Sequence, residues 1–388
     1  RSMVLNTPMG LDDISYIDNS LLGTKDPMSR LATAIKILGM YFQLLVFPSP
    51  LICDRSFNHI PNVTWSDMGS IISLLLYLAM GIYALVRLPK KDLLSFGILF
   101  YLLTIALFSN VLFMIGSVMA ERFVYFASFG FCFAIAVVLS RIFKTERITD
   151  TTRSTMVFFK NNTKVLGIIA VVIALYSFKT IERNKDWKDN YTLYSHDVNL
   201  SPNSTRIHYY LGRELIKDVA AQEKDEKKRN ELYDYGIKEL ERSIKITPAY
   251  SDAYSQMGLG YARKENSEKS IECYLRAMQY NPNDALAMNN LAAEYFKKEK
   301  YNECIELYKK ALTIDPRYAD AMVNLGSIYG TIKDFDNAIV WFTKAINTSP
   351  GFAKAYMFLS MTYKYKGDKA NAELYYGKAV QLDPSLKQ

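Results

Sequence analysis

The stretch NPNDALAMNNLAAEYFKKEKYNECIELYKKALTIDP, residues 281–316, decides the fold of the second half of the chain. One proline lies near its start, at 282, and another ends it, at 316. Further prolines continue the series outward at 248, 350 and 384, and every interval is 34 residues. A fixed period of this length is typical of stacked helical hairpins, each of which buries its apolar face only against its neighbours.

The residues between these prolines fit the tetratricopeptide consensus when each proline is set to position 32. Position 8, where two helices approach closely, then holds a small residue, position 24 an aromatic ring, and position 27 alanine. An imperfect repeat precedes the four regular ones, and its charged insertion, residues 221–230, predicts either a longer helix hairpin or a solvated loop. We therefore predict a tetratricopeptide α-solenoid over residues 186–388. The three registers read Gly258, Ala292, Gly326, Ser360; Tyr274, Tyr308, Phe342, Tyr376; and Ala277, Ala311, Ala345, Ala379.

Composition separates the chain into two halves. Half of the 388 residues are apolar and 22% are charged, which excludes a disordered chain. Residues 1–180 hold 16 Lys and Arg against 10 Asp and Glu, a net of +6, whereas residues 181–388 hold 31 against 29, a net of +2. The excess of basic residues in the first half lies in short loops between apolar runs. This placement favours membrane topology over a nucleic-acid partner.

Four apolar segments in the first half are predicted to cross a bilayer, which takes about 20 residues. A fifth run, 31–47, contains Lys36 and Gln43 and ends at a Pro-Ser-Pro break; it could span, but we favour a helix lying in the interface. The sequence thus predicts an all-α protein with a loop domain over 1–67 and membrane helices over 68–180. The four segments are 68–86, 93–115, 123–142 and 164–178.

The charges of the loops predict the orientation in the membrane. Lys and Arg concentrate in the loops 87–92 and 141–162, which we therefore place in the cytoplasm. The loop 53–67, the corner 117–122 and the whole repeat domain then lie on the other side. The sequence leaves open whether the membrane is the endoplasmic reticulum or a bacterial inner membrane.

An amide row is the candidate binding feature of the repeats. Position 6 of three successive repeats holds Gln256, Asn290 and Asn324, and amides on a concave face could hydrogen-bond an extended peptide. The alternative is that asparagine is merely common at this position.

The four cysteines and three histidines are too scattered for a metal site, and Cys273 and Cys304 are predicted core residues.

The pair Glu121-Arg122 is the candidate site of the membrane half. It stands at the predicted non-cytoplasmic start of a membrane helix, where ionisable residues are costly and usually functional. Arginine suits a lipid-linked phosphate because its planar fork gives bidentate contacts. The alternative is an interfacial arginine with Glu121 as its partner.

Around this pair the sequence resembles the transmembrane-and-tetratricopeptide O-mannosyltransferases, the TMTC family. The segment SNVLFMIGSVMAERFVYFASFGF, residues 109–131, carries the pattern, with Ala127 where proline is usual. In the upstream stretch 16–61 the resemblance rests on Asp18, Asn19, Arg30 and a Pro-x-x-Leu-x-x-Asp turn that ends at Asp54; Arg55 stands where tryptophan is frequent. The stretch ERNKDWKDNYTLY, 182–194, is also similar. The matching residues of the first segment are Ser109, Asn110, Ala120, Glu121, Arg122, Tyr125, Ser128, Gly130 and Phe131.

The resemblance implies a partial GT-C-like membrane glycosyltransferase. Such an enzyme would transfer mannose from a polyprenyl-phosphate donor to Ser or Thr of proteins on the non-cytoplasmic side, with no bound cofactor. It implies donor binding by Glu121, Arg122 and Tyr125 and acceptor protein or peptide binding by the repeat groove. The catalytic carboxylate is expected upstream of Arg1, so Asp12 and Asp13 are not assigned to it, and the chain is expected to be a C-terminal portion. The alternatives are a membrane-anchored repeat scaffold without activity and a lipid-linked sugar polymerase or ligase.

Overall fold

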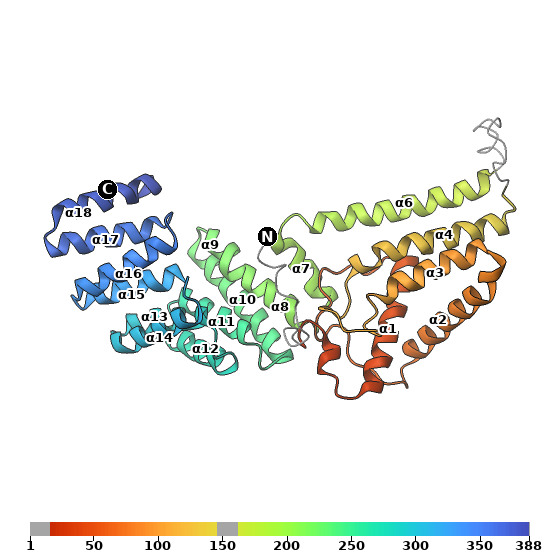
Figure 1. Cartoon of the computed structure of the whole chain (residues 1–388), viewed down its shortest axis with the longest axis horizontal. Coiled ribbons are helices and arrows are strands. Elements are labelled where there is room, and N and C mark those ends of the chain that lie inside the picture. The colour runs from red at the N-terminus through yellow and green to blue at the C-terminus, as the bar shows by residue number, and fades with distance from the viewer. Residues whose placement is uncertain (1–15, 146–161, 388) are drawn as a thin grey trace. The chain divides into compact units, whose positions relative to one another are not determined.

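The computed structural model describes residues 16–145 and 162–387. All regular elements of these residues are helices, so the predicted all-α fold is confirmed (Figure 1). The chain divides into two compact units, Arg1–Leu211 and Gly212–Gln388. The predicted repeat domain begins at residue 186, and its first residues, 186–211, group with the first unit.

The helices of the first unit begin at residues that the sequence suits to capping. Asp26, Asp67, Asp92 and Asp189 each accept a hydrogen bond from a backbone N–H in the first turn of the helix that follows. These carboxylates satisfy donors that the helix itself leaves unpaired. The helices are α1 (Pro27–Val46), α2 (Met68–Arg87), α3 (Leu93–Ala106), α4 (Val124–Ile142), α6 (Thr163–Asp186) and α7 (Asn190–Leu200), and a short 3-10 turn, η4 (Glu121–Phe123), leads into α4.

Within residues 16–145 and 162–387, four helical stretches are long and apolar enough to cross a membrane. They are Pro27–Val46, Met68–Lys90, Glu121–Ile142 and Thr163–Asp186. The last is longer than the predicted 164–178, because α6 continues without a break through the polar residues up to Asp186. Large apolar side chains of α2, α4 and α6 point away from the protein, as they would in lipid.

The predicted span 93–115 is wrong at its second end. Helix α3 stops at Ala106 and has only 14 residues. Beyond it, Asn110 adopts a positive φ of 55° and its side chain bonds the loop: its Oδ1 accepts from Ile115 N–H, and its Nδ2 donates to the carbonyls of Ser117 and Val118. This amide satisfies backbone groups that a helix would otherwise pair, so the apolar run 107–115 forms a loop.

Helix α1 lies across the other helices of the unit. Near its start Lys36 pairs with Asp67 and the carbonyl of Ala32 accepts from Ser70, both at the beginning of α2. In its middle the Tyr41 hydroxyl accepts from Ala120 N–H, just before η4. At its end the carbonyls of Leu45 and Val46 accept from Tyr176 of α6. Contacts with the starts of α2 and α4 and then with α6 are those of a crossing helix. By its length and composition this helix is also a candidate span, so the interfacial placement stays a prediction.

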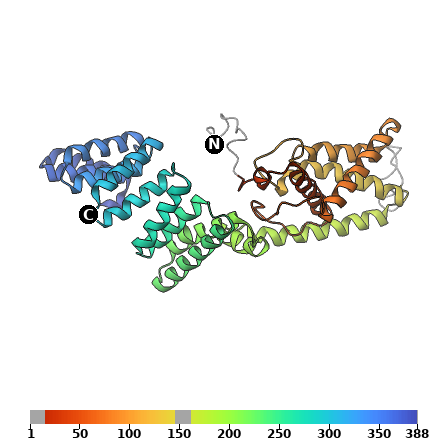
Figure 2. The ribbon, with the colours of Figure 1, turned by 90° about the horizontal axis from the view of Figure 1, so that it is seen from below.

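Two glycines set the close approach of α3 and α4. A Cβ on Gly130 would lie 2.6 Å from the backbone nitrogen of Tyr101, and one on Gly97 would lie 3.0 Å from that of Ala134. Backbone atoms cannot move aside as side chains do, so both positions require glycine. Helix α6 runs alongside α4 in both views (Figures 1 and 2).

The second unit contains the predicted solenoid. The first helices of the four repeats begin at intervals of 34 residues, and so do the second helices, which confirms the register set by the prolines. The imperfect repeat contains a longer hairpin, as one of the two alternatives predicted, because α10 has 21 residues. The helices are α8 (Thr205–Glu214), η5 (Leu215–Val219), α9 (Ala220–Gln222), α10 (Glu226–Ile246), α11 (Ser251–Arg263), α12 (Ser267–Tyr280), α13 (Ala285–Lys297), α14 (Tyr301–Ile314), α15 (Ala319–Thr331), α16 (Phe335–Thr348), α17 (Ala353–Lys366) and α18 (Lys369–Leu382).

Each repeat is held by contacts between its own two helices. A Cβ on Gly258 would lie 2.7 Å from the ring of Tyr274, so position 8 must be small because the ring of position 24 lies on it. Position 20 donates to the carbonyl of position 8 through Ser270 Oγ at 2.9 Å and through Cys304 Sγ at 3.2 Å. Cys304 is fully buried, as predicted for a core residue.

Candidate functional site

Three loop segments meet at one end of the helices of the first unit. They are residues 16–26, 50–60 and 109–122, which we call the loop face. Asn19 joins the first segment to the third, donating to Asn110 Oδ1 and to the Ile115 carbonyl at 2.9 Å each. Phe57 N–H joins the second segment to the first by donating to the Ile17 carbonyl at 3.1 Å. The motifs found by resemblance are therefore adjacent in space.

Glu121 is held by the second segment. Its Oε1 accepts from Ile52 N–H at 2.7 Å and from Arg55 Nη2 at 3.2 Å. Arg55 is only 4% exposed, and Nη2 also donates to the Pro50 carbonyl at 2.7 Å. The interfacial alternative predicted that Glu121 pairs with Arg122, whereas in the structure Glu121 forms its ion pair with Arg55.

Arg122 and Tyr125 face outward at the start of α4. The Arg122 guanidinium is exposed, lies 5.2 Å from the centre of the Phe123 ring, and has no acidic partner in the part of the chain that the structure describes. Tyr125, one turn later, is 75% exposed. Because Arg55 engages Glu121, the charge of Arg122 remains available to an anion, and the first turn of a 19-residue helix adds a favourable dipole.

The remaining motif residues have structural contacts. Asn19 is fully buried, and its Oδ1 caps the turn that begins at Ser20, while Asp18 pairs with Arg206 at 2.6 Å. Asp54 Oδ2 accepts from Ser56 N–H at 3.1 Å and from its hydroxyl, which closes the turn around Arg55. Arg30 is exposed on the first turn of α1, and none of the contacts of Glu121 or Asp54 involves it.

His59 completes the surroundings of Arg55. Its Nε2 lies 3.3 Å from Arg55 Nη1, and because arginine has only donors, this nitrogen must accept. Burial, with the nearby Arg55 charge, lowers the pKa of His59 to about 4. The ring is therefore neutral near pH 7, and Glu121 alone provides the negative charge that balances Arg55 here.

A second buried ion pair supports the loop face and was missed by the sequence analysis. Asp197 of α7 is fully buried and binds Arg183 of α6 through two contacts, at 2.6 and 2.8 Å. Its Oδ2 also accepts from Cys53 N–H at 2.7 Å, which connects the pair to the second loop segment. Burial alone would raise the pKa of Asp197, but these hydrogen bonds outweigh burial and lower it. Arg183 lies in the stretch 182–194 that resembles the family, which is the one signal that pointed here.

An apolar groove runs between α4 and α6. It has a volume of about 850 Å³, and its walls are aliphatic side chains of the two helices with Leu44 and Leu45 of α1. On α4 it begins at Ser128, one turn after Tyr125. The loop face and the groove thus share the start of α4.

The predicted amide row of the repeats is largely engaged within the protein. Gln256 is buried, and its Oε1 has no hydrogen-bond partner among the described residues. Asn289 donates to Asn290 Oδ1 at 3.1 Å and accepts from Asn324 Nδ2 at 3.0 Å. Asn290 and Asn324 remain partly exposed. These two members of the row are thus joined through Asn289 by side-chain hydrogen bonds that cross from one repeat to the next.

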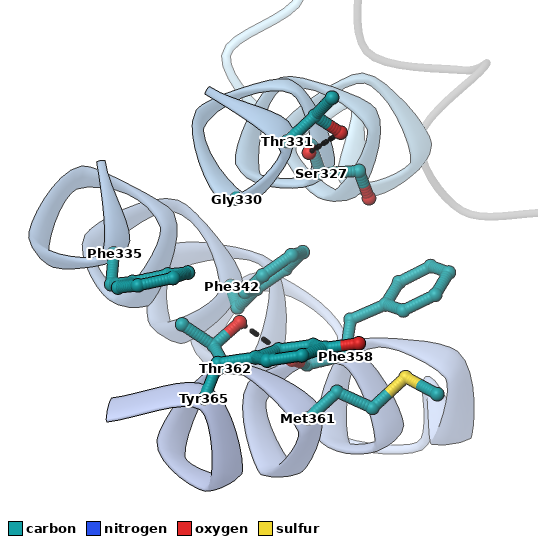
Figure 3. Close-up of a pocket in the computed structure, with 9 residues that line it drawn as sticks. All are labelled: Ser327, Gly330, Thr331, Phe335, Phe342, Phe358, Met361, Thr362 and Tyr365. Atoms are coloured by element: carbon teal, nitrogen blue, oxygen red, sulfur yellow. Dashed lines mark hydrogen bonds between the residues drawn. The ribbon is translucent and has the colours of Figure 1, made fainter. Parts of the chain in front are cut away.

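A pocket of about 360 Å³ lies between α15 and α17 (Figure 3). Hydroxyl-bearing residues of α15 form one side and residues of α17 the other, with the Phe342 ring between them. Tyr365 is 77% exposed and stacks on Phe335 with the two rings 5° from parallel. The pocket presents aromatic surface to solvent. Its lining is Ser327, Gly330, Thr331, Phe335, Phe342, Phe358, Met361, Thr362 and Tyr365.

Two repeat models match the second unit of the chain. A tetratricopeptide repeat model matches residues 251–284, 319–352 and 353–386, and a second model, described as a TPR repeat, matches 292–333. Among solved structures, the crystal structure of MamA is 25% identical and covers 42% of this chain and 94% of its own, with a TM-score of 0.37.

The curated relatives are protein O-mannosyl-transferases. The chain is 26% identical over 238 residues to TMTC1 of Mus musculus, which is 60% of this chain and 23% of that protein. It is 25% identical over 270 residues to TMTC3 of Homo sapiens, 68% of this chain and 27% of that protein. A Caenorhabditis elegans relative, F38B6.6, is 28% identical over 204 residues, 51% of this chain and 26% of its own length. The resemblance to the TMTC family is confirmed, and the chain spans about a quarter of the length of these relatives.

Proposed function

We propose that this chain serves a membrane glycosyltransferase of the protein O-mannosyltransferase type. In this proposal mannose passes from a polyprenyl-phosphate donor to Ser or Thr of a protein, the loop face binds the donor, and the repeats bind the acceptor. The observation that carries the proposal is the exposed charge of Arg122 at the start of a candidate membrane helix, left free because Arg55 holds Glu121. The names of the relatives support the reaction class.

Arg122 would act by binding the donor's phosphate. Its planar fork gives two parallel charge-assisted hydrogen bonds to phosphate oxygens. A phosphate held there would be the leaving group of the transfer, and its charge would grow as the bond to mannose breaks, so the contact would strengthen toward the transition state. Inversion at the anomeric carbon would also need a carboxylate base, which we assign to no residue of this chain.

Arg122→Ala is expected to weaken binding of polyprenyl-phosphate-mannose by about ten- to a hundredfold, the equivalent of roughly 1.5–3 kcal/mol for a bond to a charged group. The donor affinity of Arg122→Lys should lie between those of the parent and Arg122→Ala, because lysine keeps the positive charge but lacks the planar guanidinium. The affinity of the purified, monodisperse 388-residue protein for the labelled donor measures both effects. Lys25→Ala, an exposed basic residue on the first loop segment, is the control. Equal affinity for Arg122→Ala and the parent would retire the phosphate role.

We place the loop face and the repeats on the non-cytoplasmic side. The loop that joins α2 to α3 and the end of α4 lie at the opposite end of these helices and contain Arg87, Lys90, Lys91 and Arg141. Such a bias of basic residues favours the cytoplasmic side for that end. Asp92 pairs with Arg141, so one of these charges is balanced within the protein.

Protease added to sealed vesicles with the cytoplasmic side outward should leave the repeats intact. The membrane would separate them from the protease if the charge bias sets the orientation. Immunodetection of a fragment that contains residues 212–388 gives the readout. The same digestion after permeabilisation with detergent is the control and should remove the fragment. Cleavage within the repeats of sealed vesicles would reverse the assigned orientation.

Tetratricopeptide arrays bind peptides or proteins, and we assign the acceptor to this unit. The pocket between α15 and α17 offers aromatic surface, and the neighbouring Asn324 offers an amide for a peptide backbone. Both features belong to the first helices of adjacent repeats, so an extended segment of the acceptor could contact them together. The acceptor would thus be recognised apart from the hydroxyl that receives mannose.

A further inference from the structure

We infer that the groove between α4 and α6 holds the hydrocarbon chain of the polyprenyl phosphate whose phosphate contacts Arg122. The inference rests on the proposed function and adds the place of the donor's lipid chain. The groove is built for a chain rather than for a compact ligand, because it follows two candidate membrane helices along their length. On α4 its lining runs from Ser128 to Leu139 and on α6 from Ile168 to Ile181.

The lining is apolar at every level of the groove. Ile135 and Leu139 of α4 face Ile169, Val172 and Ile173 of α6 across it. Polar groups in the lining are few and small, such as Ser128 near the loop face and Ser177 and Thr180 on α6. A chain of isoprene units would remove this surface from contact with other lipids without leaving any buried charge unpaired.

The end of α1 is fixed against the groove by hydrogen bonds from a residue that lines it. The Tyr176 hydroxyl donates to the carbonyls of Leu45 and Val46 at 2.9 and 2.8 Å. These bonds hold the end of α1 against α6, where Leu44 and Leu45 contribute to the lining. The groove therefore has α4 and α6 as its two long walls, and the end of α1 contributes to a third.

The charge that selects the occupant lies at the start of α4. Tyr125, Ser128 and Cys132 are spaced i, i+3 and i+7, so they share one face of the helix. Arg122 precedes Tyr125 by one turn and has no acidic partner among the described residues. At about 1.5 Å per residue, Arg122 and Ile135 are separated by roughly 20 Å along the helix. A phosphate at Arg122 with a long linear chain of methyl-branched isoprene units behind it matches this separation.

The groove is tested by filling it. Val172 and Val171 are neighbours on α6 and both are exposed, but Val172 lines the groove and Val171 does not. Val172→Trp should weaken binding of undecaprenyl phosphate by the purified 388-residue protein at least tenfold, because the indole occupies the space of the chain. Val171→Trp, the matched control, should stay within twofold of the parent. Equal affinities of the two variants would overturn the inference.

A natural thiol gives a second readout. Cys132 is exposed and lines the groove, whereas Cys273 and Cys304 are buried. Cys53 is partly buried, and burial together with Asp197 raises the pKa of its thiol, which slows its reaction. Undecaprenyl phosphate should therefore protect Cys132 from an apolar maleimide, as measured by peptide mass spectrometry. Unchanged alkylation of Cys132 at a saturating lipid concentration would contradict the placement.

Competing lipids and the arginine variant separate the possible outcomes. Geranyl phosphate has a chain that ends before Ile135 and should bind more weakly than undecaprenyl phosphate. Dioleoyl phosphatidate that competed equally would show a general phospholipid site and overturn the assignment. Loss of binding in Arg122→Ala but not in Val172→Trp would retain the phosphate role and reject the groove. The reverse pattern would retain the groove and reject the phosphate role.

Discussion

Asp197→Ala should destabilise the loop face by up to about 3–5 kcal/mol, because it removes the fully buried one of the two carboxylates that pair with the Arg183 guanidinium. Only Asp186, 3.0 Å from Nη1 and partly exposed, would remain as a counter-charge. Asp197 is fully buried, and its carboxylate contacts two nitrogens of Arg183, the N–H of Cys53 and, at 3.0 Å, Nδ1 of His196. Hydrogen exchange measured on the full chain should show lost protection in α7 and in residues 50–60. Protection in the second unit is the internal reference, and an unchanged pattern in α7 would contradict the prediction.

The matched control replaces the whole pair. Arg183→Met with Asp197→Leu exchanges two charges for apolar groups of similar volume, which is often neutral or stabilising. The double variant should therefore recover most of the protection that Asp197→Ala loses. If both lose protection equally, the damage comes from packing and from the unpaired Cys53 N–H rather than from the buried charge.

The same carboxylate gives the stability of the loop face a pH dependence of known sign. Its pKa in the folded protein is lowered, so its contribution is complete above its unfolded value of about 3.9 and is lost as pH falls through the folded value. Protection of α7 should thus decrease in acid below about pH 4 in the parent. The doubly substituted variant should lack this dependence.

Phe342→Ala is expected to cost about 3–5 kcal/mol, the range for removing a buried phenylalanine ring. Phe342 is 2% exposed, and the ring lies on Gly326, whose added Cβ would be 2.8 Å from it. It also forms the floor between the two sides of the pocket in Figure 3. Hydrogen exchange should report loss of protection in α15, α16 and α17.

Tyr365→Ala is the control for Phe342→Ala. This ring belongs to the same pocket but is 77% exposed, so its removal creates no buried cavity. It should change protection little. Comparable losses for both variants would show that the pocket is held by its exposed rings and would contradict the assigned role of position 24.

The repeats could be predicted in detail because their packing repeats along the sequence. A small residue at position 8 and a ring at position 24 contact one another inside each hairpin, as Gly258 and Tyr274 do. The fixed spacing of these two residue types along the sequence therefore indicates the contact between them. The membrane helices were predictable for a related reason, since lipid selects long apolar runs. The end of α3 could not be predicted in this way, because residues 107–115 are mostly apolar and their hydropathy contains no information on the hydrogen bonds that Asn110 forms with the loop.

The ion pairs of the loop face lay beyond sequence reasoning. Adjacent residues suggested that Glu121 pairs with Arg122, but the actual partner, Arg55, is 66 positions away in a loop without any period. Asp197 likewise gave no local signal, since its partner is on a different helix. A lone charge can be recognised as unusual from its place at a helix end, but its counter-ion is set by how the loops fold over one another. The sequence therefore predicted Arg122 as a candidate and did not explain why it is free.

Several contacts between the two helices of one hairpin recur along the second unit and stay inside that hairpin. Ser270 donates to the carbonyl of Gly258, Cys304 to that of Ala292, and Ser360 to that of Ala372, while Phe342 lies on Gly326. A duplication or loss of 34 residues in register would therefore leave these contacts intact and would change only the number of hairpins. Unequal recombination within the coding sequence could thus lengthen or shorten the array in whole steps, so the number of repeats can evolve separately from the membrane helices.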